Sequence, residues 1–133
     1  MSELEKYSKG LADINRLRIL NLLLRGALCG CDIQYVLGTS QPNVSRHLQY
    51  LKNSGLVQDR REGYRVFYRV TDTRTSTRKS LFEFLQLAFK NEEPFRGDVK
   101  KLKDAVNEGA CTLSELTNIS VLSTSRSTQS VRA

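Results

Sequence analysis

Residues 39–51 constrain the fold of this chain more than any other stretch, because they combine a helix start with a two-sided helical pattern. Ser40 is a favoured N-cap residue. Pro42 fits the first helical turn, where the amide that it lacks would have no intrahelical partner. Large apolar residues recur at helical spacing: Val44, Leu48 and Leu51. The pattern predicts a helix that packs on the protein through one side and exposes the other.

The exposed side of this predicted helix carries only hydrogen-bonding side chains and has no acidic residue. These side chains belong to Gln41, Asn43, Ser45, Arg46 and Gln49. Amide and guanidinium groups reach base edges and phosphates in DNA. Together with Ser40 at the helix start, they form a candidate DNA-binding face. The alternative interpretation is an ordinary solvated helix face.

The segments on either side of this helix favour the DNA-binding interpretation. Amphipathic patterns predict helices over residues 3–12 and 14–25, the second with Asp13 as its cap. A short helix that starts near Ile33 stops at Gly38, and the predicted residue 41–51 helix follows at once. A short helix, a tight turn and a second helix are the layout of a helix-turn-helix, whose second helix enters the major groove.

A β-hairpin is predicted directly after the helix-turn-helix. Residues 56–61 and 65–70 are rich in β-branched, aromatic and basic residues, and they flank a turn at Gly63. Three arginines crowd the predicted tip: Arg60, Arg61 and Arg65. In this position the hairpin is expected to be a wing that contacts phosphates, which dominate affinity for DNA. A merely solvated hairpin is the alternative.

The C-terminal third of the chain predicts two more helices and a tail. Residues 75–91 have an apolar surface wide enough to suggest subunit contact as well as core packing. The candidate interface residues are Leu81, Phe84, Leu85 and Phe89. A last helix is expected from a cap at Asp98 to about residue 107. Residues 1–109 would form one DNA-binding and dimerisation domain, and residues 110–133 a disordered tail rich in Ser and Thr.

Charge and composition narrow the partners and the compartment. The 133 residues carry a formal net charge of +7 with a pI near 9.6, which favours a polyanionic partner. No apolar run approaches the roughly 18 residues of a membrane span, and the N-terminus lacks the layout of a secretory signal. A cytoplasmic protein without a membrane partner is expected. The three cysteines should then be thiols.

Four motifs in combination resemble the ArsR/SmtB family over about residues 5–72. They are Leu11-Ala12-Asp13 with Arg16 and Ile19-Leu20; Leu28-Cys29-Gly30-Cys31-Asp32-Ile33; Ser40-Gln41-Pro42-Asn43-Val44-Ser45-Arg46-His47-Leu48; and Leu51-Lys52-Asn53-Ser54-Gly55-Leu56-Val57. The resemblance implies a mainly α fold with a β-hairpin wing, a homodimeric winged helix-turn-helix. It also implies a repressor of double-stranded operator DNA, not an enzyme, that uses no organic cofactor and leaves DNA when a metal or metalloid binds.

The second motif is similar to the thiol site of the arsenical-responsive branch of that family. By resemblance, Cys29 and Cys31 would bind trivalent arsenic, as arsenite or an organoarsenical, with antimony and cadmium as other candidates. That branch usually has a third cysteine where this chain has Gln34. Cys111 is then the candidate third ligand, and the alternative is a stray tail cysteine without a role in binding. The zinc-sensing branch places His and carboxylate pairs on its dimerisation helix, whereas residues 75–91 contain no His and one acid.

The spacing of the two thiols suggests a mechanism. Residues i and i+2 do not face each other on a helix, so Cys29 and Cys31 are expected to share one ion only if their segment is non-helical. Binding would then pin or unwind the start of the first helix of the helix-turn-helix and disturb groove contacts.

His47 is the single histidine, and its place beside Leu48 predicts a hydrogen-bonded packing role rather than a metal ligand.

Three alternatives keep these residues but change the function. The first is a winged-helix repressor in which Cys29 and Cys31 form a thiol redox switch. The second is a thiol oxidoreductase that uses Cys29, although no general base accompanies the pair. The third is a scaffold with a structural zinc site, although three thiols fall short of the usual four ligands within one subunit.

Overall fold

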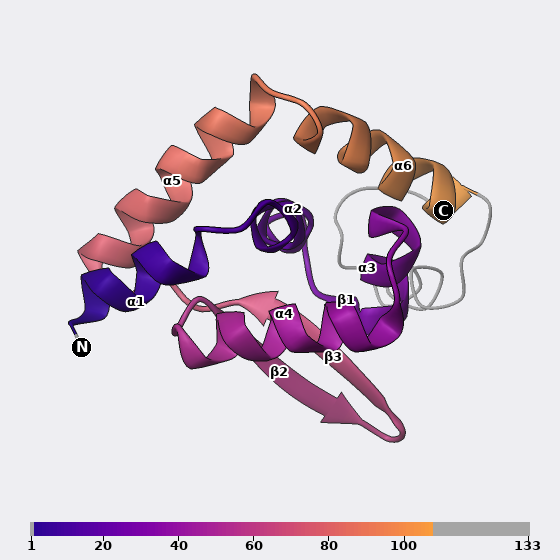
Figure 1. Ribbon diagram of the computed structural model, residues 1–133, viewed down its shortest axis with the longest axis horizontal. Helices are drawn as coiled ribbons and strands as arrows, with labels where there is room; N and C mark the ends of the chain where they lie inside the picture. The colour runs from indigo at the N-terminus through magenta and orange to yellow at the C-terminus, as the bar shows by residue number, and fades with distance from the viewer. Residues whose placement is uncertain (1, 108–133) are drawn as a thin grey trace.

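The computed structural model describes residues 2–107, in which helices pack around a central helix and a small antiparallel sheet lies along one side (Figure 1). The elements in chain order are α1 (Glu3–Gly10), α2 (Ile14–Leu23), β1 (Leu28–Cys29), α3 (Gly30–Leu37), α4 (Gln41–Asn53), β2 (Val57–Glu62), β3 (Arg65–Val70), α5 (Ser76–Lys90) and α6 (Phe95–Asn107). This is a winged helix-turn-helix, which confirms the expected mainly α fold with a hairpin wing. The expected tail, residues 110–133, lies outside the described residues, as do Gly109 and Cys111.

Helix α2 is the centre of the core. Figure 1 shows it end-on, with α3, α4, α5 and α6 around it, and it packs against all four. Its residues 19–23 are all buried, because neighbours cover the C-terminal half of the helix on every side. Asp13 caps it as expected: its Oδ1 accepts the backbone N–H groups of Asn15 at 2.8 Å and Arg16 at 3.2 Å. The helix ends at Leu23, two residues earlier than predicted.

Polar contacts from α2 fix the position of α6. The Arg18 guanidinium donates two hydrogen bonds to the Asp98 carboxylate, at 2.7 and 2.9 Å, and the Asn21 amide donates to the carbonyl of Phe95 at 3.0 Å. Asp98 was expected to cap the last helix, but α6 already begins at Phe95. The expectation is corrected: Asp98 lies within the first turns of α6 and is buried as the partner of Arg18.

The helix-turn-helix is formed by α3 and α4, with Gly38 between them. Gly38 has φ 69°, a left-handed conformation that glycine adopts without strain, and it ends α3. Helix α3 starts at Gly30, earlier than predicted, so Cys31 and Asp32 belong to its first turn. Cys29 precedes the helix in an extended conformation.

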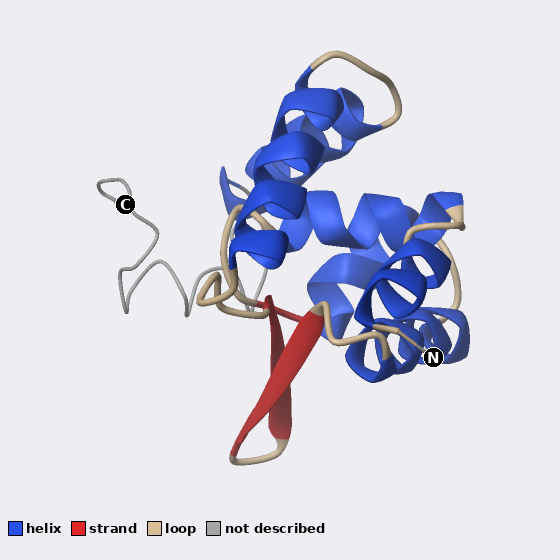
Figure 2. Ribbon diagram, turned by 90° about the vertical axis from the view of Figure 1, so that its left-hand side faces the viewer, coloured by secondary structure: helices blue, strands red, loops and turns tan. Residues whose placement is uncertain are grey.

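The three-stranded sheet has the order β1-β3-β2, and its long hairpin projects away from the helices (Figure 2). The hairpin agrees with the predicted wing. Strand β1 was not predicted: it contains two residues, which pair with β3 in the register Leu28 to Tyr68 and Cys29 to Phe67. This pairing attaches the thiol segment directly to the wing.

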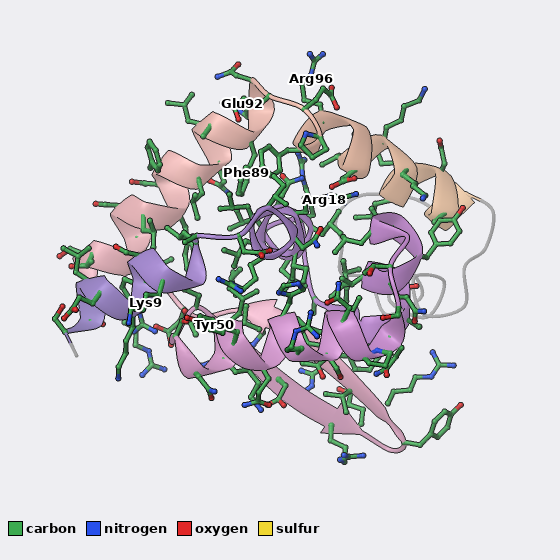
Figure 3. All side chains as sticks on the ribbon, viewed as in Figure 1. Lys9, Arg18, Tyr50, Phe89, Glu92 and Arg96 are labelled. Atoms are coloured by element: carbon green, nitrogen blue, oxygen red, sulfur yellow. The ribbon has the colours of Figure 1, made fainter. Side chains whose placement is uncertain are left out.

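The predicted interface residues of α5 differ in burial: some lie in the core and others on the surface. Leu85 and Phe89 are 3% and 5% exposed and belong to the core of the protomer. In Figure 3, Phe89 lies between α5 and α2. Leu81 is half-buried, whereas Phe84 and Leu87 are both more than 60% exposed. The apolar surface that α5 presents to solvent therefore consists of Phe84 and Leu87.

Helix α1 is held to the body by its buried Tyr7 and by an arginine of α2. Arg16 on α2 donates to the carbonyls of Gly10 and Lys9, both at 2.9 Å. These bonds satisfy carbonyls at the end of α1, which stops at Gly10 rather than at residue 12. No helix within residues 2–107 is long and apolar enough to cross a membrane.

Candidate nucleic-acid interface and thiol site

Helix α4 has the two faces that its sequence predicts. The Ser40 hydroxyl accepts the backbone N–H of Asn43 at 3.3 Å, which confirms the cap. Val44, Leu48 and Leu51 are buried, each at 2% exposure or less. The helix is therefore fixed by its apolar face, and its polar face is turned outward.

The polar face of α4 is ordered by hydrogen bonds between its own side chains. The Gln41 amide donates to the Ser45 hydroxyl at 3.3 Å, and the Gln49 amide donates to Asn53 at 3.1 Å. The Arg46 guanidinium donates to the Asn43 side-chain carbonyl. Ser40, Gln41, Ser45, Arg46 and Gln49 are exposed and Asn43 is half-buried. Donors and acceptors thus line one accessible surface, which is what reading base edges requires.

The wing presents basic and aromatic groups, but its arginines are not equivalent. Arg60 forms an ion pair with Glu62 at 2.6 Å, and Arg61 is exposed. Arg65 is half-buried, with its guanidinium 5.6 Å from the centre of the Tyr64 ring. Tyr64, 86% exposed at the turn, was not singled out from the sequence. Its place between a turn glycine and an arginine was the available signal.

Two contacts anchor α4 to the start of α2. The Arg16 guanidinium lies over the Tyr50 ring at 4.0 Å from its centre. His47 is buried, with its Nε2 4.0 Å from Asp13 Oδ1. Burial lowers the pKa of His47, and the carboxylate of Asp13 opposes that shift. The expected packing role of His47 is confirmed, with an acidic partner at ion-pair distance in place of a hydrogen bond.

The two thiols meet at the junction of β1 and α3. Cys29 is buried and serves as the N-cap residue of α3, with φ −86° and ψ 164°, while Cys31 is exposed in the first turn. The Cys29 thiol donates to Asp32 Oδ2 at 3.8 Å. The two sulfurs and a carboxylate oxygen of Asp32 all lie within 4.8 Å of one another. Two soft donors and one oxygen therefore converge on one point.

The thiol segment is non-helical only in part: Cys29 is extended, whereas Gly30 and Cys31 begin α3. Cys31 is helical and its sulfur is still close to that of Cys29, because Cys29 lies just before the helix in extended backbone. Asp32, which is buried, was missed as a possible ligand. Its position three residues after Cys29 could have indicated this role, because residues i and i+3 lie on the same side of a helical turn. Cys111 lies outside the described residues.

A groove of about 440 Å³ joins the thiols to α4 and the wing. Its lining comes from three segments of the chain: Cys29, Gly30, Cys31 and Gln34; Gln41, Val44, Ser45 and Leu48; and Tyr64, Arg65, Val66 and Tyr68. The first segment is the thiol site, the second is the start of α4 and the third belongs to the wing. A ligand on the thiols would thus lie between the helix face and the wing.

Transcriptional regulators of known resistance systems are similar to about half of this chain. The arsenical resistance operon repressor of Escherichia coli K12 is 50% identical over 64 residues, 47% of this chain and 55% of the repressor. An arsenic resistance transcriptional regulator of Pseudomonas putida is 46% identical over 63 residues, 47% of this chain and 49% of the regulator. The chain spans about half the length of these relatives.

Solved structures are similar over most of their own length. HlyU from Vibrio cholerae has a TM-score of 0.60 at 31% identity, covering 67% of this chain and 94% of that one. A homodimeric winged helix-turn-helix DNA-binding domain from Mycobacterium bovis has a TM-score of 0.56 at 35% identity, covering 65% and 77%.

A sequence model described as "Bacterial regulatory protein, arsR family" matches residues 13–59, from the cap of α2 into β2. The proteins matched are transcriptional regulators and not enzymes. The chain belongs to the arsR family of bacterial regulatory proteins.

Proposed function

We propose that this protein is a homodimeric transcriptional repressor that leaves double-stranded operator DNA when trivalent arsenic binds the thiolates of Cys29 and Cys31. One observation carries the proposal: the thiols, the polar face of α4 and the wing line the same groove. A ligand that joins the sulfurs acts where the DNA-facing elements meet.

The DNA-binding part rests on the exposed face of α4 and the basic wing. A recognition helix in the major groove would bring Gln41, Ser45 and Arg46 to base edges and phosphates. Arg61 and Arg65 on the wing would contact phosphates, as would Arg60 once it exchanges Glu62 for a phosphate. The net charge of +7 favours the same partner.

The arsenic-binding part rests on the chemistry and spacing of the donors. Thiolates prefer soft acceptors, and with metal–sulfur bonds of about 2.3 Å, as for zinc, two sulfurs bound to one ion at a tetrahedral angle lie about 3.8 Å apart. The spacing here needs only a small adjustment of Cys31, which is exposed and can rotate. The names of the Escherichia coli and Pseudomonas putida relatives support arsenic over other soft ions. Asp32 supplies a nearby third donor, so the site does not depend on Cys111.

Coupling to DNA follows from what the thiol segment touches. Cys29 pairs with Phe67 of β3, and Cys31 belongs to α3, which packs on α4. Drawing the sulfurs together therefore shifts the wing and the recognition helix relative to each other. A coupling free energy of about 1–3 kcal/mol, or roughly 5- to 150-fold in affinity, is usual for such a switch.

The test is titration of a protein–DNA complex, with an operator selected by the protein from random duplexes. Fluorescence anisotropy should fall on addition of arsenite and should be unchanged by Mg²⁺. Antimonite should release no more DNA than arsenite does. Release by hydrogen peroxide that dithiothreitol reverses, without a response to arsenite, would instead establish the redox switch that the closeness of the two sulfurs also permits.

Arg46→Ala should weaken specific binding by about 1–3 kcal/mol, the range for one good base or phosphate contact. Affinity for unrelated DNA should fall less. Lys103→Ala is the matched control, because Lys103 is an exposed cation on α6, away from the recognition helix. An operator affinity for Arg46→Ala equal to that of the control would remove Arg46 from the interface.

Dimerisation is expected to use the exposed apolar residues of α5. Phe84 and Leu87 are one turn apart on that helix, and paired half-sites about 34 Å apart require two recognition helices. Phe84→Glu should convert the dimer to monomers in sedimentation velocity and weaken operator binding. Gln86→Glu adds the same charge to an exposed neighbour and should stay dimeric. A dimeric Phe84→Glu variant would place the interface elsewhere.

A further inference from the structure

We propose that the groove selects the inducer: a trivalent arsenical with one apolar substituent, preferably aromatic, whose ring occupies the space between α4 and β3. Gly30 is the residue that keeps this space open. The inference rests on the proposed function and names the class of ligand for the same site.

The donor set favours a singly substituted arsenical. The described residues supply two thiols, Cys29 and Cys31. Gln34 lines the groove beside them and offers no third thiol. In the reaction R–As(OH)₂ + 2 Cys–SH → R–As(S–Cys)₂ + 2 H₂O, two As–O bonds break and two As–S bonds form. The thiol protons leave in water and arsenic stays trivalent. Cys29 and Cys31 alone therefore complete the coordination of such an arsenical, and its substituent remains free to contact the protein.

The groove offers an apolar place for that substituent. Val44 and Leu48 come from α4, and Val66 and Tyr68 come from β3. An apolar cavity of about 150 Å³ is enough to hold benzene, and this groove measures about 440 Å³. Cys31 is exposed, so a ligand can enter from solvent and reach buried Cys29 beside it.

Gly30 borders the groove between the two cysteines. A Cβ added at Gly30 would meet only the Tyr68 ring within 4 Å, at 4.0 Å. The position is the first residue of α3, and its φ lies outside the range that strains other residues. A larger side chain is therefore tolerated by the backbone while it takes up space beside the sulfurs. Glycine leaves that space to the ligand.

A ring in this position would act on DNA binding directly. Gln41 and Ser45 of the DNA face, and Arg65 of the wing, also line the groove. A substituent wedged between α4 and β3 therefore separates the two elements that contact DNA. The extent of release should rise with the size of the substituent.

The experiment compares arsenite, methylarsenous acid and phenylarsenous acid by two readouts. Anisotropy gives the concentration for half-release of operator DNA, and native mass spectrometry gives adduct formation without DNA. Both are normalised to competition by dithiothreitol, which corrects for the intrinsic thiol affinity of each arsenical. After normalisation, phenylarsenous acid should act at about tenfold lower concentration than methylarsenous acid, since burial of roughly 60 Å² more apolar surface at about 25 cal/mol per Å² corresponds to that factor.

Two variants assign the effect to the groove. Gly30→Leu should remove the preference for the phenyl compound, to within about twofold of methylarsenous acid, and leave the arsenite adduct intact. Gly30→Ala is the matched control and should retain most of the preference. Val66→Gln, on the opposite wall, provides a second variant if Gly30→Leu fails to fold, as judged by circular dichroism.

Equal normalised potency of the two organoarsenicals, or a preference that survives both Gly30→Leu and Val66→Gln, would overturn the inference. A failure of the proposed function has a different signature. In that case no arsenical releases DNA, while mass spectrometry still reports whether the phenyl compound forms the preferred adduct with Cys29 and Cys31.

Discussion

Replacing Cys31 by serine is expected to abolish arsenical-induced release of operator DNA and to leave operator affinity within about twofold of wild type. Serine is not a soft donor, and one remaining thiolate cannot draw β1 and α3 together. The whole coupling, about 5- to 150-fold in affinity, should therefore be lost. Cys31 is the better position for this test because it is exposed, whereas Cys29→Ser would also bury a hydroxyl in β1. Anisotropy titration of the complex with arsenite measures both affinity and release.

Cys111→Ser is the matched control for the same experiment. If Cys29, Cys31 and Asp32 suffice, this variant should respond to arsenite and to phenylarsenous acid as the wild type does. A selective loss of the arsenite response would identify Cys111 as a third ligand. Normal dissociation of Cys31→Ser would show that the thiol pair is not the sensor.

Arg18→Met is expected to lower the free energy of unfolding by about 3–5 kcal/mol, the usual cost of breaking a buried ion pair from one side. Asp98 is 5% exposed and receives two hydrogen bonds from the Arg18 guanidinium. Methionine preserves the apolar stem of the side chain, so the change in the free energy of unfolding reports the removal of the charge and its hydrogen bonds. Urea denaturation at a fixed protomer concentration measures it, since dimerisation makes stability concentration-dependent.

The matched controls separate charge from packing. Arg25→Met changes an exposed arginine that follows the same helix and should cost less than about 0.5 kcal/mol. The double variant Arg18→Met with Asp98→Leu removes both charges and should recover most of the lost stability. A loss below about 1 kcal/mol for Arg18→Met alone would mean that the pair does not fix α6 on α2.

The sequence by itself determined the elements that depend on neighbouring residues. The cap at Ser40, the proline in the first turn and the apolar spacing of Val44, Leu48 and Leu51 specify α4 and its two faces, because capping and periodicity act within a few residues. The hairpin follows in the same way from a turn glycine between strand-forming runs. The candidate DNA face could be predicted for that reason.

Only the tertiary structure decided which distant segments meet. The pairing of Cys29 with Phe67, the ion pair between Arg18 and Asp98 and the burial of Leu85 and Phe89 join residues far apart in the chain. A two-residue strand is too short to show a periodic pattern. An apolar residue on α5 fits the same sequence pattern whether it faces the core or a partner subunit. The groove exists for the same reason: its walls come from α3, α4 and β3, and their distances are set by packing around α2.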